Sequence, residues 1–418
     1  MSPRADTVRK TTLPNGLRIV TQRVPGTLSA AISLHVLAGP RHEAPDCRGA
    51  THFIEHLLFK GTQRRSAHDI AVAMDAVGGM LNAFTDREVT SIQARVMGEH
   101  VAAAADVICD MAVNAAFDPE ELEREREVVV QEIKQYEDDP EEMSHDLLAE
   151  SVWPEHPLGA PVMGSEAQVR ALSRERVIVY FRERYVPANM VVAAAGDVDH
   201  RRIVSLFGRA LSSTGEAPAD PAHPPRSVAP GRRVLSRPGE QVHFCLGAPA
   251  YAQSDDRNYT VWLLDRIVGS GMSSRLFQEV REKRGLVYNI GSYAAAYRDA
   301  GLFAAYGATT PGQLETVLAL IGDEFEAMRA RGASDDELRR AKAQVKAGLA
   351  MALESTGYRA TYAAMCEIYW GRHIPVGEVV AKVEAVTRED VTQIANQVLD
   401  PQRLAYAAVG PLQEEAAP

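Results

Sequence analysis

The sequence predicts a mixed α+β protein made of two homologous halves, and three observations lead to this prediction. The chain has 418 residues, too many for one compact core, so two or more domains are expected. Two segments 214 residues apart match each other without a gap. Between them, residues 212–233 are rich in Pro, Ala, Ser and Gly and show no periodicity, which is typical of a linker. We therefore predict domains at 1–211 and 234–418.

The repeated unit reads as a helix, a proline-marked turn, an apolar strand and a terminating glycine. It occupies residues 173–198 and 387–412. Identical residues fall at matching places: Arg174 and Arg388, Glu175 and Glu389, Val177 and Val391, Pro187 and Pro401, Ala193 and Ala407, Ala194 and Ala408, Gly196 and Gly410. Upstream, 118–126 also resembles 334–342, each with an acidic opening before a helical run. Chance similarity is the alternative, but a gapless match that keeps Arg-Glu, Pro and Gly in order favours duplication.

Composition and charge limit the class of protein. The chain is 46% hydrophobic and 24% charged, as in ordinary globular proteins, and its net charge of -11 argues against a nucleic-acid scaffold. Four scattered cysteines without a CxxC pair indicate reduced thiols rather than a disulfide framework or a Cys-rich zinc module. The start shows no apolar region of a signal peptide, and no apolar run reaches membrane-spanning length. We expect a cytoplasmic protein that contacts neither nucleic acid nor membrane.

Residues 52–56, His-Phe-Ile-Glu-His, are the strongest candidate for a metal site. On a helix, side chains at positions i and i+4 lie one above the other, so His52 and His56 can face one ion. Glu55 lies beside this pair, where its carboxylate can reach a water bound to the ion. Catalytic zinc typically takes three protein ligands and one water, and this order of residues inverts the commoner His-Glu-x-x-His. Two histidines on a helix are more often an accident of surface or core, so the motif requires a third ligand.

The glutamate-rich helix expected at 118–140 offers that ligand. An apolar stripe runs along it, formed by Leu122, Val129, Ile133 and Tyr136. Glu125 and Glu132 fall inside the stripe, and Glu121 lies near its edge. Buried carboxylates are costly unless a cation compensates them, so Glu132 is the candidate third ligand and Glu125 an auxiliary carboxylate. The alternative is a shallow stripe from which both glutamates reach water.

The second half of the chain serves as an internal control. If Leu122 is aligned with Leu338, Ala341 stands opposite Glu125 and Gly348 opposite Glu132. The second half also contains no His-x-x-Glu-His. Structural glutamates would have no reason to disappear together with the histidines, so this comparison favours a functional site in the first half.

The motif and Glu132, which lies 76 residues past His56, resemble those of the pitrilysin-type zinc peptidases. This inverzincin family includes mitochondrial processing peptidase and insulin-degrading enzyme. Longer stretches agree: GATHFIEHLLFKGT, LNAFTDREVTSIQARV, EREREVVVQEIKQYEDDP, HPLGAPVMGS, RYVPANMVVAAAGDVD and GSGMSSRLFQEVREKRGLVYNIGSY. They span nearly the whole chain, whose length is similar to that of the short bacterial subfamily related to mitochondrial processing peptidase. The resemblance implies two homologous α/β-sandwich halves, closed like a clamshell around a chamber.

The resemblance also implies roles for residues of both halves. It implies one zinc ion on His52, His56 and Glu132, with Glu55 as general base and Glu125 as a carboxylate close to the site. The LNAFT segment, with Asn82, Ala83 and Phe84, is similar to the edge strand that binds an extended peptide. In the second half, Arg281 and Tyr288 match residues that complete the site when the halves close. Arg284 is the alternative arginine, and an ordinary helix surface followed by a strand is the plainer interpretation of this stretch.

The function implied by the resemblance is that of a zinc metalloendopeptidase that hydrolyses short or unfolded peptides in the chamber. One alternative is a non-catalytic structural or partner subunit, although such relatives commonly lose the motif that this sequence keeps. Another is an active subunit that requires a motif-lacking partner. Short bacterial relatives look like dimers, so we expect a homodimer, with a heterodimer as the alternative.

Overall fold

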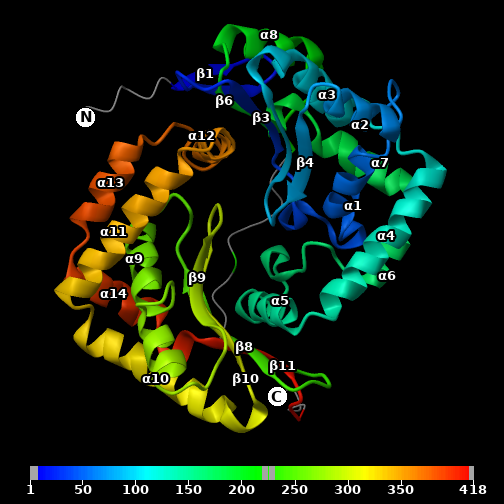
Figure 1. The fold of residues 1–418 in the computed structure, drawn as a ribbon. Coiled ribbons are helices and arrows are strands. Elements are labelled where there is room, and N and C mark those ends of the chain that lie inside the picture. The colour runs from blue at the N-terminus through cyan, green and yellow to red at the C-terminus, as the bar shows by residue number, and fades with distance from the viewer. Residues whose placement is uncertain (1–7, 219–224, 226–230, 414–418) are drawn as a thin grey trace. The chain divides into compact units, whose positions relative to one another are not determined.

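The computed structural model describes residues 8–218, 225 and 231–413 (Figure 1). The chain forms two compact units. The first consists of Met1–Lys134, Pro161–Ala222 and Ala350–Pro375, and the second of Gln135–Ala160, His223–Leu349 and Val376–Pro418. Part of the predicted linker, at 219–224 and 226–230, lies outside the described residues. The predicted domain boundaries remain a prediction.

Six strands form the sheet of the first unit, in the order β1-β2-β6-β3-β5-β4. Strands β2 and β6 are parallel, and the other neighbouring pairs are antiparallel. Strand β4 is an edge strand that pairs with β5. The strands are β1 Val8–Thr12, β2 Arg18–Arg23, β3 Ser29–Val36, β4 Met80–Thr85, β5 Thr90–Met97 and β6 Met190–Gly196.

Five strands form the sheet of the second unit, in the order β7-β11-β8-β10-β9. They are β7 Arg232–Ser236, β8 Val242–Ala250, β9 Ile290–Ala296, β10 Gly301–Thr309 and β11 Ala405–Gly410. Strands β7 and β11 are parallel and the other neighbours antiparallel, so this order repeats β2-β6-β3-β5-β4 of the first sheet. The predicted duplication of an α+β unit is therefore confirmed.

The two copies also repeat individual contacts. Arg174 donates from Nε to the carbonyl of Phe117 at 2.6 Å, and Arg388 donates to the carbonyl of Ala333 at the same distance. The glycines that end β6 and β11 have φ of +113° and +155°, and a Cβ on either would lie within 2.6 Å of a carbonyl oxygen. Only glycine fits such a position, which explains the matching glycines in the sequence.

Two equivalent helices are exchanged between the units. Helix α5 (Pro140–Val152), from the first half of the sequence, packs against β8 and β11. Helix α12 (Thr356–Trp370, orange in Figure 1), from the second half, packs against β3 and β6. Ala360 and Ala364 of α12 are buried against this sheet, and their small side chains let the helix approach closely. Each copy of the repeat therefore contributes to both units.

Strand β6 shows that both faces of the first sheet are covered. Val192 and Ala194 belong to the large hydrophobic core that includes buried residues of α1, α3, α4, α7 and α8. Val191, Ala193 and Ala195 alternate with them and pack against α12 instead. All seven residues of the strand are buried, which explains its unbroken apolar sequence.

The remaining helices fall into two sets. In the first unit they are α1 Ala50–Leu58, α2 Ala67–Asp75, α3 Val101–Asn114, α4 Pro119–Glu137 (entering the second unit at its end), α6 Glu166–Ala171, α7 Arg174–Arg184 and α8 His200–Ala210. In the second they are α9 Asn258–Val268, α10 Leu314–Arg331, α11 Asp335–Ala352 (running into the first unit at its end), α13 Val376–Ala385 and α14 Arg388–Val398. Within the described part of the chain, none of the helices has the length and apolar character needed to cross a membrane.

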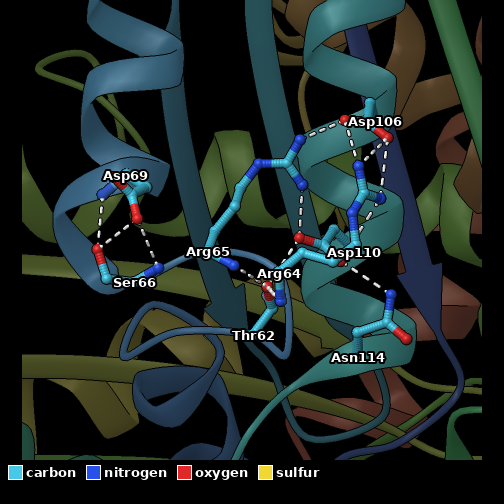
Figure 2. Close-up of polar contacts among 8 residues, drawn as sticks. All are labelled: Thr62, Arg64, Arg65, Ser66, Asp69, Asp106, Asp110 and Asn114. Carbon is cyan, nitrogen blue, oxygen red and sulfur yellow. Dashed lines mark hydrogen bonds and ion pairs between the residues drawn. The ribbon is translucent and has the colours of Figure 1, made fainter.

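The turn that follows α1 is tied to α3 by a polar cluster (Figure 2). Arg65 lies 2.5 Å from the buried carboxylate of Asp110, which also accepts a hydrogen bond from Thr62 at 2.8 Å. Arg64 and Arg65 both pair with Asp106, one turn earlier on α3. Because one of these carboxylates is fully buried, it depends on its partners for compensation. The cluster therefore fixes the chain at the end of α1.

A histidine is buried within the first sheet. His35 of β3 is inaccessible to solvent, and its ring nitrogens lie 2.7 Å from Ser91 Oγ and 2.8 Å from Ser33 Oγ. Burial lowers the pKa of His35 from 6.5 to about 3. The folded protein therefore holds this ring neutral at pH values where the unfolded chain protonates it.

We predict that His35 contributes to acid unfolding. Between pH 6.5 and about 3, the unfolded chain binds a proton on His35 that the folded protein does not. The free energy of unfolding therefore falls as the pH falls, by at most about 1.4 kcal/mol per pH unit for one group. In His35→Gln this dependence becomes shallower, although the loss of a fitted ring lowers the stability at pH 7. Denaturant titrations across this range measure both, with exposed His68→Gln as control, and an unchanged slope would contradict the prediction.

Candidate metal centre

Helix α1 carries the two histidines, and a buried glutamate fixes its start. The N-cap residue Gly49 has φ of +83°, and a Cβ there would lie 2.7 Å from the carbonyl oxygen of Met163. The Glu43 carboxylate accepts hydrogen bonds from the N–H groups of Gly49 at 2.8 Å and Thr51 at 2.7 Å. A carboxylate is favourable here because it satisfies free N–H groups at the positive end of the helix dipole. The protein therefore holds the start of α1 in one position.

Helix α4 is joined to α1 through the side chain of Arg126. The guanidinium lies 5.2 Å from the ring centroid of Phe53, which is fully buried in α1. Arg126 also donates to the main-chain carbonyls of Val169 and, at 2.8 Å, Leu172. Cation–π and hydrogen-bonding contacts of one buried arginine thus link α4 to α1 and to the chain around α6.

Three potential metal ligands converge between α1 and α4. Glu132 Oε2 lies 3.8 Å from His52 Nε2 and 3.2 Å from His56 Nε2. One ligand atom from each residue lies within 4.8 Å of the others. Atoms about 2.1 Å from one tetrahedral zinc ion lie about 3.4 Å from each other, so the spacing is close to that of a zinc site.

The hydrogen-bonding of these residues also fits a metal. Glu132 Oε2 is buried and has no hydrogen-bond partner among the described residues, although His56 Nε2 is near it. A buried carboxylate oxygen without a partner is costly unless a cation compensates it. Two imidazoles and one carboxylate are moreover a donor set of catalytic zinc sites. His52, His56 and Glu132 therefore fit a zinc ion.

Glu125 and Lys60 lie behind His56. Glu125 is 5% exposed, and its Oε1 lies 3.0 Å from His56 Nδ1. Its other oxygen lies 2.5 Å from Lys60 Nζ. In the tautomer with the proton on Nδ1, His56 donates a hydrogen bond to this carboxylate. The lone pair of Nε2 then faces Glu132 and is available to a metal. Lys60 compensates the charge of the buried carboxylate.

The pKa values of the three potential ligands are shifted in different directions. Burial, and then the neighbouring His56, lowers the pKa of His52 from 6.5 to about 4. Burial by itself would lower the pKa of His56, but Glu132 and Glu125 outweigh this effect and the pKa is raised. His56 in turn lowers the pKa of Glu132. At neutral pH the site therefore offers a neutral imidazole on His52 and a carboxylate on Glu132.

Glu55 is half-buried beside these ligands. Burial raises the pKa of its carboxyl, while a hydrogen bond from Thr85 and the charge of His56 oppose this rise without cancelling it. A raised pKa makes the carboxylate a better proton acceptor near neutral pH. Because Thr85 is the last residue of β4, the contact joins Glu55 to the end of the edge strand.

The predicted peptide-binding residues lie on the edge strand itself. Asn82 and Phe84 of β4 are exposed, whereas Ala83 is buried in the core. Since β5 pairs with one side of β4, main-chain groups on the other side can pair with an extended peptide. The role of these three residues in substrate binding remains a prediction.

Arg281 and Tyr288 lie in the second unit. Arg281 belongs to a helical turn at Phe277–Glu282, and its guanidinium lies 5.3 Å from the ring centroid of Tyr288, which is 79% exposed. Arg284, the alternative arginine, pairs instead with Glu279 at 2.8 Å. Arg281 and Tyr288 thus form a pair, and their part in the site remains a prediction.

Three residues of the site were not identified from the sequence. Lys60 follows His56 by four residues, so its spacing could have suggested it. Thr85 ends the LNAFT segment and Glu43 lies six residues before Gly49, but neither position in the sequence predicts the contact with Glu55 or with the start of α1. In α11 of the second half, Ala341 is buried and Gly348 is exposed, so neither contributes a ligand.

Comparisons with known proteins define the family. Residues 18–166 match the family model of insulinase, peptidase family M16, and residues 171–345 match that of the peptidase M16 inactive domain. A Streptomyces coelicolor protein named an uncharacterized zinc protease is 41% identical, over 98% of this chain and 91% of its own length. A Bacillus subtilis protein, also named an uncharacterized zinc protease, is 34% identical over 94% of this chain and 95% of its own. The chain belongs to the pitrilysin-type peptidase family M16 and to its short bacterial subfamily, as predicted.

Solved structures share the fold. A peptidase M16 inactive domain from Pseudomonas fluorescens superimposes with a TM-score of 0.91 at 19% identity, over 98% of this chain and all of the other. A chain of complex III2 from Candida albicans gives a TM-score of 0.85 at 20% identity, over 97% and 96% of the two chains. At these identities the likeness concerns the fold alone.

We predict that His56→Ala abolishes zinc binding. The variant loses one of three converging ligands, and the remaining two leave the ion held by only half of a tetrahedral set. Zinc at a hundredfold excess over its Kd should stabilise the wild-type protein by about 2.7 kcal/mol and the variant by nothing measurable. Zinc content and denaturant unfolding with and without zinc provide the test, and His68→Ala is the control. Unchanged zinc content in His56→Ala would rule out this ligand set.

We predict that Glu125→Gln weakens zinc binding without abolishing it. The amide keeps the shape but removes the negative charge that orients and polarises His56, so the affinity should fall about 10- to 100-fold. Competition with a chelator of known affinity measures the change. Glu127→Gln, on the exposed side of the same helix, is the matched control. Equal affinities in the two variants would show that Glu125 does not support the metal.

Proposed function

We propose that this chain is a zinc-dependent endopeptidase of short or unfolded peptides. The observation that carries the proposal is the convergence of His52, His56 and Glu132, with Glu55 beside them. The names of the relatives, zinc proteases, support the same chemistry. The neighbouring edge strand offers a place for an extended peptide, the form that a protease substrate takes.

Each residue has a part in the proposed reaction. Zinc on the three ligands would polarise the peptide carbonyl and increase the acidity of the attacking water. Glu55 takes the proton of this water as the oxygen bonds to the carbonyl carbon, and returns it to the amine that leaves when the C–N bond breaks. Glu125 holds the His56 ring through Nδ1, and β4 holds the substrate main chain.

The second unit would complete the site. In the proposal, Arg281 and Tyr288 stabilise the negative charge that develops on the carbonyl oxygen when the two halves enclose the peptide. Enclosure would select substrates by size and flexibility, which is why short or unfolded peptides are the proposed class. A homodimer is the proposed assembly.

We predict that Glu55→Gln retains zinc but loses activity. The amide cannot accept a proton, so kcat/KM for quenched fluorescent peptides should fall on the order of a thousandfold. Zinc content should not change, because Glu55 is not among the converging ligands. Glu99→Gln, at a largely exposed glutamate, is the control. Full activity in zinc-loaded Glu55→Gln would disprove the mechanism, whereas a zinc-loaded wild-type chain without activity would indicate a need for a second, motif-lacking subunit.

A further inference from the structure

Beside β4, the sheet of the first unit contains a pocket under the start of α12. Strands β3, β4 and β5 form its floor, and the first turns of α12 form a wall. Its volume is about 190 Å³. A protein cavity of roughly 150 Å³ holds a benzene molecule, so this pocket can hold one amino-acid side chain.

Part of the pocket is apolar and open. Ala31, Met80, Gly357 and Ala360 line this part. The small residues of α12 leave the space free, since a Cβ on Gly357 would meet nothing closer than Ser355 Oγ at 3.5 Å. This surface suits the methylene groups of a side chain.

The rest of the pocket is polar and positively charged. Ser33, Asn82, Gln93, Arg95 and Thr361 line it. Gln93 donates to Thr361 Oγ1 at 3.4 Å, whereas the exposed guanidinium of Arg95 has no hydrogen bond or ion pair with any described residue. No carboxylate is among the lining residues, so nothing in the pocket compensates the guanidinium. Charge complementarity therefore favours an anionic group.

The position of the pocket relates it to the edge strand. Met80 pairs with Arg95 and Asn82 with Gln93, so these four side chains share one face of the sheet. A peptide added to β4 would direct every second side chain to this face. A residue opposite Asn82 or Met80 lies about three to five positions from the residue opposite Thr85, which contacts Glu55.

We propose that this pocket is a subsite for an acidic side chain of the substrate. A glutamate of the bound peptide lies with its methylene groups against Met80 and Ala360, and its carboxylate pairs with Arg95. The inference rests on the proposed function, since it assumes that a peptide binds along β4. It assigns to that function a preference for substrates with an acidic residue a few positions from the cleaved bond.

Peptide binding to zinc-loaded Glu55→Gln tests the subsite without requiring hydrolysis. The probes are fluorescent peptides that carry one Glu, Gln or Lys at each position in turn, and fluorescence polarisation measures their Kd. We expect Glu to bind about tenfold more tightly than Lys at one position. In the Glu55→Gln protein, a further Arg95→Gln substitution should remove the preference, and Arg95→Glu should reverse it. The control Arg23→Gln, at an exposed arginine at the end of β2, should leave it unchanged.

A second variant tests the pocket by its volume. Gly357→Leu should fill the space from α12, since a Cβ there meets nothing closer than 3.5 Å, and weaken the binding of Glu and Gln peptides alike at that position. The proposal is overturned if no position shows a preference, if the preference survives Arg95→Gln, or if no peptide binds. If an Arg95-dependent preference occurs but the wild-type chain cleaves none of these peptides, the subsite stands and the proposed peptidase activity fails.

Discussion

The packing of α1 against α4 is the constraint on which the candidate site depends. His52 and His56 share one face of α1 because of helical periodicity, but the third ligand comes from a helix more than 70 residues later. Glu43 fixes the start of α1, and the cluster around Asp110 fixes the turn after its end. Arg126, stacked on Phe53, joins the two helices. The three candidate ligands are therefore positioned by contacts within the protein, and such support is what a preorganised site requires.

The duplication explains why one scaffold can carry the site in only one copy. The two sheets have the same strand order, and contacts such as those of Arg174 and Arg388 recur in both. A buried carboxylate without a compensating cation would destabilise either copy. Where the histidines are missing, Ala341 in place of Glu125 removes that cost. The same scaffold can thus hold a charged cluster in one unit and an ordinary helix in the other.

The helical pattern predicted the burial of α4 with two differences, one of them at Tyr136, which is only half-buried. Leu122, Val129 and Ile133 are buried, as is Glu125 at 5% exposure. The Glu132 side chain, on the same stripe, is 44% exposed, although its Oε2 is buried. Periodicity assigns a side chain to a face of a helix, but it does not show how deep the core is at each turn. The exposed part of Glu132 leaves one side of the candidate site open to solvent.

By itself, the sequence determined the α+β class, the duplication, the family and the His-x-x-Glu-His set. Each of these four features follows from local spacing or from a match between segments, and none of them requires knowledge of distant contacts. Tertiary structure decided the rest: the exchange of α5 and α12, the support of α1 by Glu43, the contact of Thr85 with Glu55, and the pocket that contains Arg95. Apart from the contacts of Glu43, which lies six to eight residues before the groups it binds, these features join segments tens to hundreds of residues apart. No local pattern encodes such contacts, because they arise only when helices and strands pack against one another.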